Sequence, residues 1–375
     1  MIRDILKGLV AINSVFPNEK RLALSIGKLL KKSGFKVQRQ AISKGRYNLL
    51  AERGSRGRAL LFYGHMDTVP VYGKWKTNPF RLTKKGDRLY GLGAVDMKGG
   101  IAAILEATKD ETDRKIKIVL CSDEEYISTG AWKAVTERRR WFNDVAFCIS
   151  GEPGASKTSI GGSNVITLGR RGRVVISMDV YGVSSHGANP KTGVNAINEA
   201  AKMVRALNSF RLVKHRSLGS ESIFVRKMEG NTTTLSVPEK AYVEIDMHMV
   251  PPTTVRIARD RFKRFVNSLM VQGVMDKRTR IDVSVKKRET PYIEPFIDSL
   301  NNRHVESVIS TMEKHIGKLR INYGNSVSDD NIFANALGVP VMIIGPHGGN
   351  MHAGNEWVSE EDLRRLAWLY KKIIV

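Results

Sequence analysis

The feature of the sequence that most constrains its fold is a repeated alternation of apolar, strand-like runs with helix-like segments. Apolar runs typical of buried strands occur at 59–69 (ALLFYGHMDTV), 115–122 (KIKIVLCS) and 145–150 (VAFCIS). Helical patterns with glycine near their starts follow at Lys98 (KGGIAAILEATK) and Gly130 (GAWKAVTERRRWF). Because strand and helix alternate, we expect an α/β fold with a doubly wound, mostly parallel sheet.

A different pattern begins near residue 166. Strand (RVVISMDVYG), helix (VNAINEAAKMVRALNSF), two strands (ESIFVRKMEG and KAYVEIDMHMV), a long helix and a last strand (RIDVSVKK) follow one another. This β-α-β-β-α-β order is typical of a ferredoxin-like unit. The α/β pattern resumes after Pro291 with a helix near 297–316, the strand GVPVMIIG and a C-terminal helix. We therefore expect a catalytic domain formed by 1–165 and 290–375, with an inserted lid domain at 166–289.

Cysteine usage and hydropathy bear on the cellular compartment. The two cysteines, Cys121 and Cys148, lie inside apolar runs, which excludes a disulfide scaffold and fits a reducing compartment. No apolar run approaches the ~20 residues of a membrane-spanning helix, and the first 16 residues mix charges into their apolar stretch. We expect a cytoplasmic protein without a membrane partner.

The chain is strongly basic, with 61 Lys and Arg against 37 Asp and Glu and a formal charge of +24. Such an excess can attract nucleic acid or anionic substrates, or it can simply be solvated. The densest basic clusters, at 138–140 and 286–288, lack the interleaved aromatic residues of a single-strand binding surface. A solvated surface is therefore favoured over a nucleic-acid partner.

Five short polar segments stand at the ends of apolar runs and carry the candidate chemistry. They are GHMDTVP (64–70), GAVDMKGG (93–100), SDEEYISTG (122–130), SGEP (150–153) and GPHGGNMHAGNEW (345–357). They supply imidazole and carboxylate groups, the ligand set of zinc and related ions: His65, Asp67, Asp96, Glu124, Glu125, Glu152 and His352. Five carboxylates in one crevice would repel one another unless protons or multivalent cations neutralised them. Two divalent metal ions are the favoured solution.

The spacing of these residues suggests a division of labour. In a two-metal hydrolase one carboxylate bridges the ions, a water is acidified, and a carboxylate that is not a ligand takes up and returns the water's proton. The neighbouring pair Glu124 and Glu125 suits this division, because adjacent side chains at a strand end diverge. We expect Asp67, two residues beyond His65 on the same side of a strand, to orient that imidazole.

Taken in order and with their spacing, the five segments resemble the metal-site blocks of the M20 family of dinuclear metallohydrolases along nearly the whole chain. The resemblance implies five metal ligands, namely His65, Asp96, Glu125, Glu152 and His352. It also implies that Asp96 bridges the two ions, that Glu124 is the general base and that Asp67 accompanies His65. Two divalent ions are implied, with Zn²⁺ favoured and Co²⁺ as the alternative. His347, five residues before His352, is a less favoured ligand.

The resemblance extends to the inserted domain, which in this family serves as a lid and commonly mediates dimerisation. SSHGANPKTGVNAI (184–197) matches a block whose histidine reaches the reacting carbonyl, so His186 is a substrate-binding candidate. The alternative is a loop histidine that caps the helix beginning near Val194. Asn231 matches a lid position that helps to hold substrate. We expect a homodimer formed through the lid.

Two departures from the family pattern concern the substrate. Many members carry Asp-x-Arg where this chain has Asp-Met-His at 246–248, and the desuccinylases carry Ser-Asp-Gly-Arg where it has Ser-Asp-Asp-Asn at 328–331. Both missing arginines belong to positions that can grip a carboxylate. The second segment resembles the lysine/ornithine deacylases, which makes Asn331 a substrate-binding candidate.

These features predict a metal-dependent amidohydrolase that removes an acyl group from an N-acyl amino acid, as deacetylases and desuccinylases do. An M20 metallo-carboxypeptidase or dipeptidase that cleaves a short peptide is the alternative, because both reactions hydrolyse an amide. A basic nucleic-acid-binding protein with a decayed hydrolase site is a more remote alternative.

Overall fold

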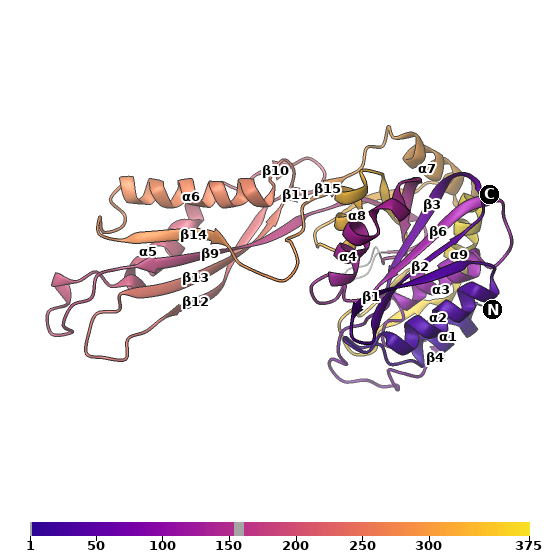
Figure 1. The fold of residues 1–375 in the computed structure, drawn as a ribbon, viewed down its shortest axis with the longest axis horizontal. Helices are drawn as coiled ribbons and strands as arrows, with labels where there is room; N and C mark the ends of the chain where they lie inside the picture. The colour runs from indigo at the N-terminus through magenta and orange to yellow at the C-terminus, as the bar shows by residue number, and fades with distance from the viewer. Residues whose placement is uncertain (1, 154–160) are drawn as a thin grey trace. The chain divides into compact units, whose positions relative to one another are not determined.

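The computed structural model describes residues 2–153 and 161–375, which fall into two compact units (Figure 1). Unit 1 is formed by the described parts of 1–169, 297–324 and 328–375, and unit 2 by 170–296 and 325–327. The chain therefore leaves unit 1 after residue 169, builds most of unit 2 and returns at residue 297, and the short segment 325–327 joins unit 2 again.

Within the described residues, unit 1 is built on a nine-stranded sheet of order β1-β2-β6-β3-β7-β17-β8-β15, with β16 beside β8. Its strands are β1 (Lys36–Ser43), β2 (Arg46–Arg53), β3 (Arg56–His65), β6 (Arg114–Cys121), β7 (Val145–Ser150), β8 (Val165–Arg170), β15 (Phe296–Ile297), β16 (Arg320–Gly324) and β17 (Val341–Ile343). The four central strands, β6, β3, β7 and β17, are parallel, while β1, β2 and β8 run antiparallel to their neighbours. The predicted α/β fold is confirmed, and its parallel centre is flanked by antiparallel strands.

Helices cover both faces of this sheet. They are α1 (Ile2–Val10), α2 (Lys20–Lys32), α3 (Lys98–Ala107), α4 (Thr129–Glu137), α7 (Arg303–Ile316), α8 (Asp329–Leu337) and α9 (Glu360–Ile374). Helix α9 packs against α1, α3 and α7, and their apolar side chains share one core with Leu60 and Phe62 of β3. Helix α4 packs against α8, and α8 packs against β17. The carboxyl ends of the parallel strands are thus flanked by loops that lead into α3 and α4.

Close packing of α3 depends on glycine. A Cβ on Gly100 would lie 2.1 Å from the carbonyl oxygen of Gly151, a distance that no side chain tolerates. This glycine pair lets the helix approach the end of β7, which brings Glu152 and the segment before α3 close together. The glycines of KGGIAAILEA therefore help to position the polar segments.

A second, small sheet fixes the C-terminal polar segment. It has the order β18-β19-β5-β4, formed by β4 (Thr83–Lys85), β5 (Arg88–Tyr90), β18 (Gly348–Gly349) and β19 (Trp357–Ser359). Strand β19 pairs with both β18 and β5, so the loop between β18 and β19 is anchored at both ends. That loop carries His352.

Unit 2 is a four-stranded antiparallel sheet with two helices on one face. Its elements are β9 (Gly172–Tyr181), α5 (Ala196–Ala206), β10 (Lys214–His215), β11 (Gly219–Ser220), β12 (Ser222–Gly230), β13 (Lys240–Met249), α6 (Val255–Val271) and β14 (Arg280–Val285). The sheet order is β12-β13-β9-β14, and β10 and β11 form a separate hairpin. The predicted β-α-β-β-α-β succession is present with that hairpin added. Alternate residues of β13, including Val243 and Ile245, pack with α5 and α6 in a second core.

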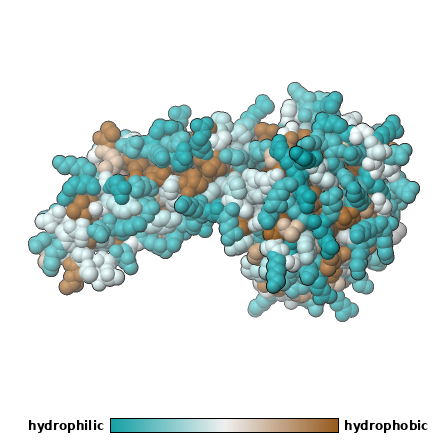
Figure 2. All heavy atoms as spheres, viewed as in Figure 1, coloured by the Kyte–Doolittle hydropathy of each residue, from teal (hydrophilic) through white to brown (hydrophobic). Residues whose placement is uncertain are grey.

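The surface is mainly hydrophilic on the face drawn in Figure 2, with apolar areas exposed on both units. Among the described residues, no helix is both long and apolar enough to cross a membrane.

Candidate metal centre

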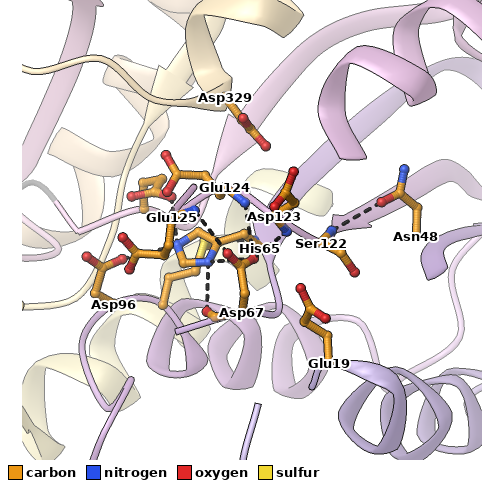
Figure 3. Close-up of polar contacts among 12 residues, drawn as sticks. Glu19, Asn48, His65, Asp67, Asp96, Ser122, Asp123, Glu124, Glu125 and Asp329 are labelled. Atoms are coloured by element: carbon orange, nitrogen blue, oxygen red, sulfur yellow. Dashed lines mark hydrogen bonds and ion pairs between the residues drawn. The ribbon is translucent and has the colours of Figure 1, made fainter. Parts of the chain in front are cut away.

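The ends of three parallel strands bring the predicted polar residues to one edge of the sheet. Strand β3 ends at His65, β6 is followed by Glu124 and Glu125, and β7 is followed by Glu152. In α/β sheets this edge is the usual position of a functional site. Figure 3 shows His65, Asp96, Glu124 and Glu125 gathered in one cluster.

Two histidines and three carboxylates form two adjoining sets. The Nε2 atom of His65 lies 3.2 Å from Asp96 Oδ1 and 3.2 Å from Glu152 Oε1. The Nε2 atom of His352 lies 3.3 Å from Asp96 Oδ2 and 3.1 Å from Glu125 Oε2. Asp96 therefore presents one oxygen to each imidazole, as a carboxylate shared by two neighbouring cation sites would.

Glu124 lies beside the same cluster without forming part of either histidine pair. Its carboxylate, that of Glu152 and the His65 ring offer ligand atoms that all lie within 4.8 Å of one another, as do those of His65, Asp96 and Glu125. The adjacent glutamates thus point to different partners, Glu125 to His352 and Glu124 toward Glu152.

The electrostatics show that this cluster needs positive charge. Burial, with the neighbouring carboxylates, raises the pKa of Glu124 well above its ordinary value and that of Glu152 to about 7. Hydrogen bonds to Asp96 and Glu125 raise the pKa of His352 to about 10. Burial lowers the pKa of His65, but its three carboxylate neighbours outweigh burial and raise it well above normal. The buried carboxylates thus create a setting around both imidazoles that favours positive charge.

The donor set fits divalent metal ions. Imidazole nitrogens and carboxylate oxygens converge in each set, and both are ligands of zinc and related ions. In addition, the buried Oε1 atom of Glu125 has no hydrogen-bond partner among the described residues. Buried oxygens are seldom left in this state unless an ion or water completes the site.

Asp67 organises the centre through the backbone of the glutamate segment. Its Oδ1 accepts the N–H groups of Asp123 at 2.9 Å and Glu124 at 3.2 Å, and its Oδ2 accepts that of Glu125 at 2.9 Å (Figure 3). The expectation that Asp67 shares a strand face with His65 is wrong, because β3 ends at His65. It is the carbonyl oxygen of Asp67, 3.0 Å from His65 Nδ1, that meets the imidazole most closely, with the carboxylate at 3.6 Å.

Glu356, which was not predicted from the sequence, plays a similar part on the other side of the centre. Its carboxylate accepts the backbone N–H groups of Gly93 at 2.7 Å, Val95 at 2.9 Å and Asp96 at 3.0 Å. The side chain is 2% exposed, and burial raises its pKa to about 8. Glu356 lies four residues after His352 in the same polar segment, and this position could have marked it as part of the site.

A buried ion-pair network also contacts the segment that carries Glu124 and Glu125. No sequence pattern predicts this network. Arg46 donates to Glu19 at 2.9 and 2.5 Å and lies 3.4 Å from Asp123 Oδ1. The same guanidinium covers the ring of Phe16, which stacks on Tyr126. The segment that carries Glu124 and Glu125 is therefore held by Asp67 on one side and Arg46 on the other.

The remaining candidates lie in different surroundings. Asn331 is fully buried in the capping box of α8, where its Oδ1 accepts the Ser328 N–H at 3.3 Å. His347 lies outside the cluster, with its Nδ1 3.0 Å from the Gly161 carbonyl oxygen and its ring against Trp357.

His186 and Asn231 belong to unit 2, and both side chains are exposed. The Nδ1 atom of His186 accepts the Ala188 N–H at 3.1 Å. The alternative in which His186 caps the following helix is wrong, because Asn195 caps α5 by accepting two backbone N–H groups.

Comparisons with known proteins agree with this geometry. Residues 61–375 match the family described as Peptidase family M20/M25/M40. A succinyl-diaminopimelate desuccinylase of Nitrosospira multiformis is 28% identical over 355 residues, covering 91% of this chain and 89% of its own. An aminopeptidase PepT from Bacillus cereus has a similar fold, with a TM-score of 0.79, 19% identity, and coverage of 100% of this chain and 97% of its own. A dinuclear metal-binding M20 peptidase from Bacillus subtilis gives a TM-score of 0.74 at 12% identity, covering 100% and 96%.

The matched region contains all five polar segments and every residue of the two histidine–carboxylate sets. The resemblance inferred from the sequence is thereby confirmed, as is the expectation of a hydrolase. The chain belongs to the peptidase family M20/M25/M40.

Proposed function

We propose that this protein is a metal-dependent amide hydrolase that removes an acyl group from an N-acyl amino acid. The observation that carries the proposal is the carboxylate of Asp96, which presents one oxygen to His65 and the other to His352. Support for the substrate class comes from two desuccinylase relatives, from Nitrosospira multiformis and Alteromonas mediterranea, which are 28% and 27% identical over most of the chain.

We assign two divalent ions to the centre, with zinc favoured and cobalt as the alternative. One would be held by His65, Asp96 and Glu152, the other by Asp96, Glu125 and His352. When bound, such ions polarise the scissile carbonyl and acidify a water molecule. The neutralising charge would also relieve the repulsion among the buried carboxylates.

Glu124 is the general base in this proposal. Among the described residues its carboxylate forms no ion pair with either histidine, in contrast to those of Glu125 and Glu152, so it can face a water molecule instead of an ion. Burial raises its pKa, which makes it a stronger base toward the water proton. It would take that proton and return it to the departing amine nitrogen, while Asp67 holds the backbone N–H group of Glu124 in place.

Substrate binding and assembly are assigned to further residues of the chain. We propose that His186, Asn231 and Asn331 contact the substrate and that two copies associate through unit 2. Strand β12 supports the second point, because it lies at the edge of its sheet and exposes Phe224 and Met228. The buried free thiols of Cys121 and Cys148 support a cytoplasmic location.

A substrate panel tests the reaction. N-acetyl-ornithine, N-acetyl-lysine, N-succinyl-diaminopimelate and dipeptides would be assayed with protein of measured metal content. We expect turnover of an N-acyl amino acid. Cleavage confined to dipeptides would instead establish the peptidase alternative. The hydrolase proposal would fail if no amide were cleaved and the protein bound nucleic acid in a salt-dependent manner.

Subunit mixing tests whether His186 acts across a dimer. His186→Ala and Glu124→Gln subunits should each be inactive, but a mixed dimer would contain one site in which both residues are intact. We expect the mixture to regain part of the parental activity, measured against each variant alone. A strictly monomeric active enzyme would exclude this arrangement.

A further inference from the structure

A second concentration of polar side chains lies at the opposite edge of the unit 1 sheet from the metal centre. Strands β3, β6 and β7 begin at this amino edge, whereas His65 and the glutamates follow their carboxyl ends. The ten residues of β3 alone separate the two edges by roughly 30 Å at ~3.3 Å per residue. Any site here is therefore independent of the metal ligands.

Four arginines, which we call the arginine pocket, line a cavity of about 660 Å³ at this edge: Arg56, Arg58, Arg114 and Arg303. The wall also includes His304, Phe147 and a single acidic side chain, Asp113. Among the described residues, no ion pair joins any of the four guanidinium groups to a carboxylate. Four guanidinium groups around one cavity, with Asp113 as the single acidic side chain in its wall, form a strongly positive site.

The protein holds part of this pocket in a fixed arrangement. Arg114 Nη1 donates to the carbonyl oxygens of Ile373 at 3.1 Å and Ile374 at 3.4 Å, and its guanidinium lies 5.8 Å from the centre of the Phe147 ring. His304 stacks on the same ring, with the ring centres 5.1 Å apart and an interplanar angle of 27°. Two groups of the wall are thus aligned by one buried aromatic ring.

Donors remain available for a ligand. Arg58 uses Nη2 to reach the Val145 carbonyl at 2.5 Å, and Arg303 uses Nε to reach His304 Nε2 at 3.3 Å. Each guanidinium carries five N–H groups, so most of them stay free. Helix α7 begins at Arg303, and the partial positive charge of its first turn adds to the field of the pocket.

We propose that the arginine pocket binds a small phosphorylated molecule. Planar guanidinium groups recognise phosphate through paired hydrogen bonds, and several of them together favour a ligand with more than one negative charge. The cavity is of the size that accepts a small organic ligand, and the stacked ring of His304 offers a flat surface beside the charges. Ligand binding in the arginine pocket would also explain part of the +24 formal charge of the chain.

Calorimetric titration of the metal-loaded protein with ADP tests the proposal at ~0.15 M salt. Adenosine serves as the uncharged control, and metal content is measured after each titration. We expect ADP to bind and adenosine not to bind. The double variant R58Q/R303Q should weaken ADP binding at least tenfold, and R303Q alone, which loses only the contact to His304, should weaken it in the same direction.

The matched control is R21Q/K28Q, which removes the same two charges from exposed positions of α2. This control should bind ADP as the parent does. Equal weakening in both double variants would show a net-charge effect and overturn the proposal. ADP binding unchanged in R58Q/R303Q would place the nucleotide elsewhere, such as the metal centre, and also overturn it. Tighter binding of a 20-nucleotide single strand, lost equally in both variants, would favour nucleic acid instead.

Discussion

The neighbouring glutamates 124 and 125 have different partners in the structure, although the sequence gives them identical side chains. Glu125 faces His352 at 3.1 Å, whereas Glu124 lies beside Glu152 and outside both histidine pairs. The backbone of both residues is fixed by Asp67. The difference between them is therefore one of direction, set by the turn after β6.

Isosteric substitution should separate the roles of these two residues. Glu124→Gln keeps the shape of the side chain but cannot accept a proton, so turnover should fall by roughly 100- to 10,000-fold with metal content unchanged. Glu125→Gln should lose metal as well. Turnover and elemental analysis of both variants measure this, and equal metal loss in the two would reverse or remove the assignment.

Glu356 should matter for stability as well as for metal binding. In Glu356→Gln, one carboxylate oxygen becomes an amide donor that faces a backbone N–H group, and a buried unsatisfied group typically costs about 1–3 kcal/mol. The free energy of unfolding, measured by urea denaturation, should fall by that amount, and metal should bind more weakly. Glu361→Gln, on the exposed side of α9, is the control and should change neither quantity. Unchanged metal affinity in Glu356→Gln would argue that the Asp96 segment does not need this support.

Single residues could be predicted from the sequence where their side chains are typical metal ligands. Residues that instead fix the backbone of neighbouring segments could not be predicted. His65, Asp96 and Glu125 stand in short polar segments after apolar runs, so their proximity follows from strand ends meeting at one edge. Glu19 and Arg46 pair across separate elements, and nothing in their local sequence reveals that contact.

The elements themselves were predictable where apolar periodicity was strong. Strands β3, β6 and β7 and helix α9 coincide with continuous apolar or amphipathic runs. The hairpin of β1 and β2 was not predicted, because its residues mix charges with short apolar stretches. Strands β18 and β19 have only two and three residues, too few for any period to be recognised.

Asp298, which follows β15, joins this element to β17 and should make stability depend on pH. Its Oδ2 accepts the Val341 N–H at 2.8 Å, and burial raises its pKa to about 7. In the unfolded chain the pKa is near ~3.9. Between these values the folded state retains a proton that the unfolded chain has released, so this contribution is complete below about pH 4 and is lost as pH rises through 7.

Asp298→Asn retains an acceptor oxygen but carries no charge. The variant should match its parent near pH 4.5 and exceed its stability at pH 8, by at most roughly 4 kcal/mol. Urea denaturation at both pH values measures the difference, with exposed Asp282→Asn as the control. An effect of equal size at both pH values would show that the change in packing, rather than the charge, is responsible.

For the whole molecule, metal binding should be a large part of the stability of unit 1. The proposed ligands come from segments near residues 65, 96, 125, 152 and 352, so bound ions would tie together distant parts of the chain. An ion at 1,000 times its Kd stabilises the folded state by about 4 kcal/mol. Chelation should therefore lower Tm by several degrees, as scanning calorimetry would record. Asp96→Asn, which cannot hold both ions, should respond little to the chelator, and an equal shift in both proteins would contradict the assignment.

The insertion of unit 2 has a consequence for synthesis on the ribosome. The chain leaves unit 1 through β8 and re-enters through β15, which is the neighbour of β8 in the sheet. All but three residues of unit 2 are continuous, so that unit can complete itself while translation is still under way. Unit 1 cannot, since β17 and α9 emerge last. Until then the nascent chain carries an incomplete sheet that lacks its strand β17 and the cover of its final helix, and this interval is when it most needs protection from aggregation.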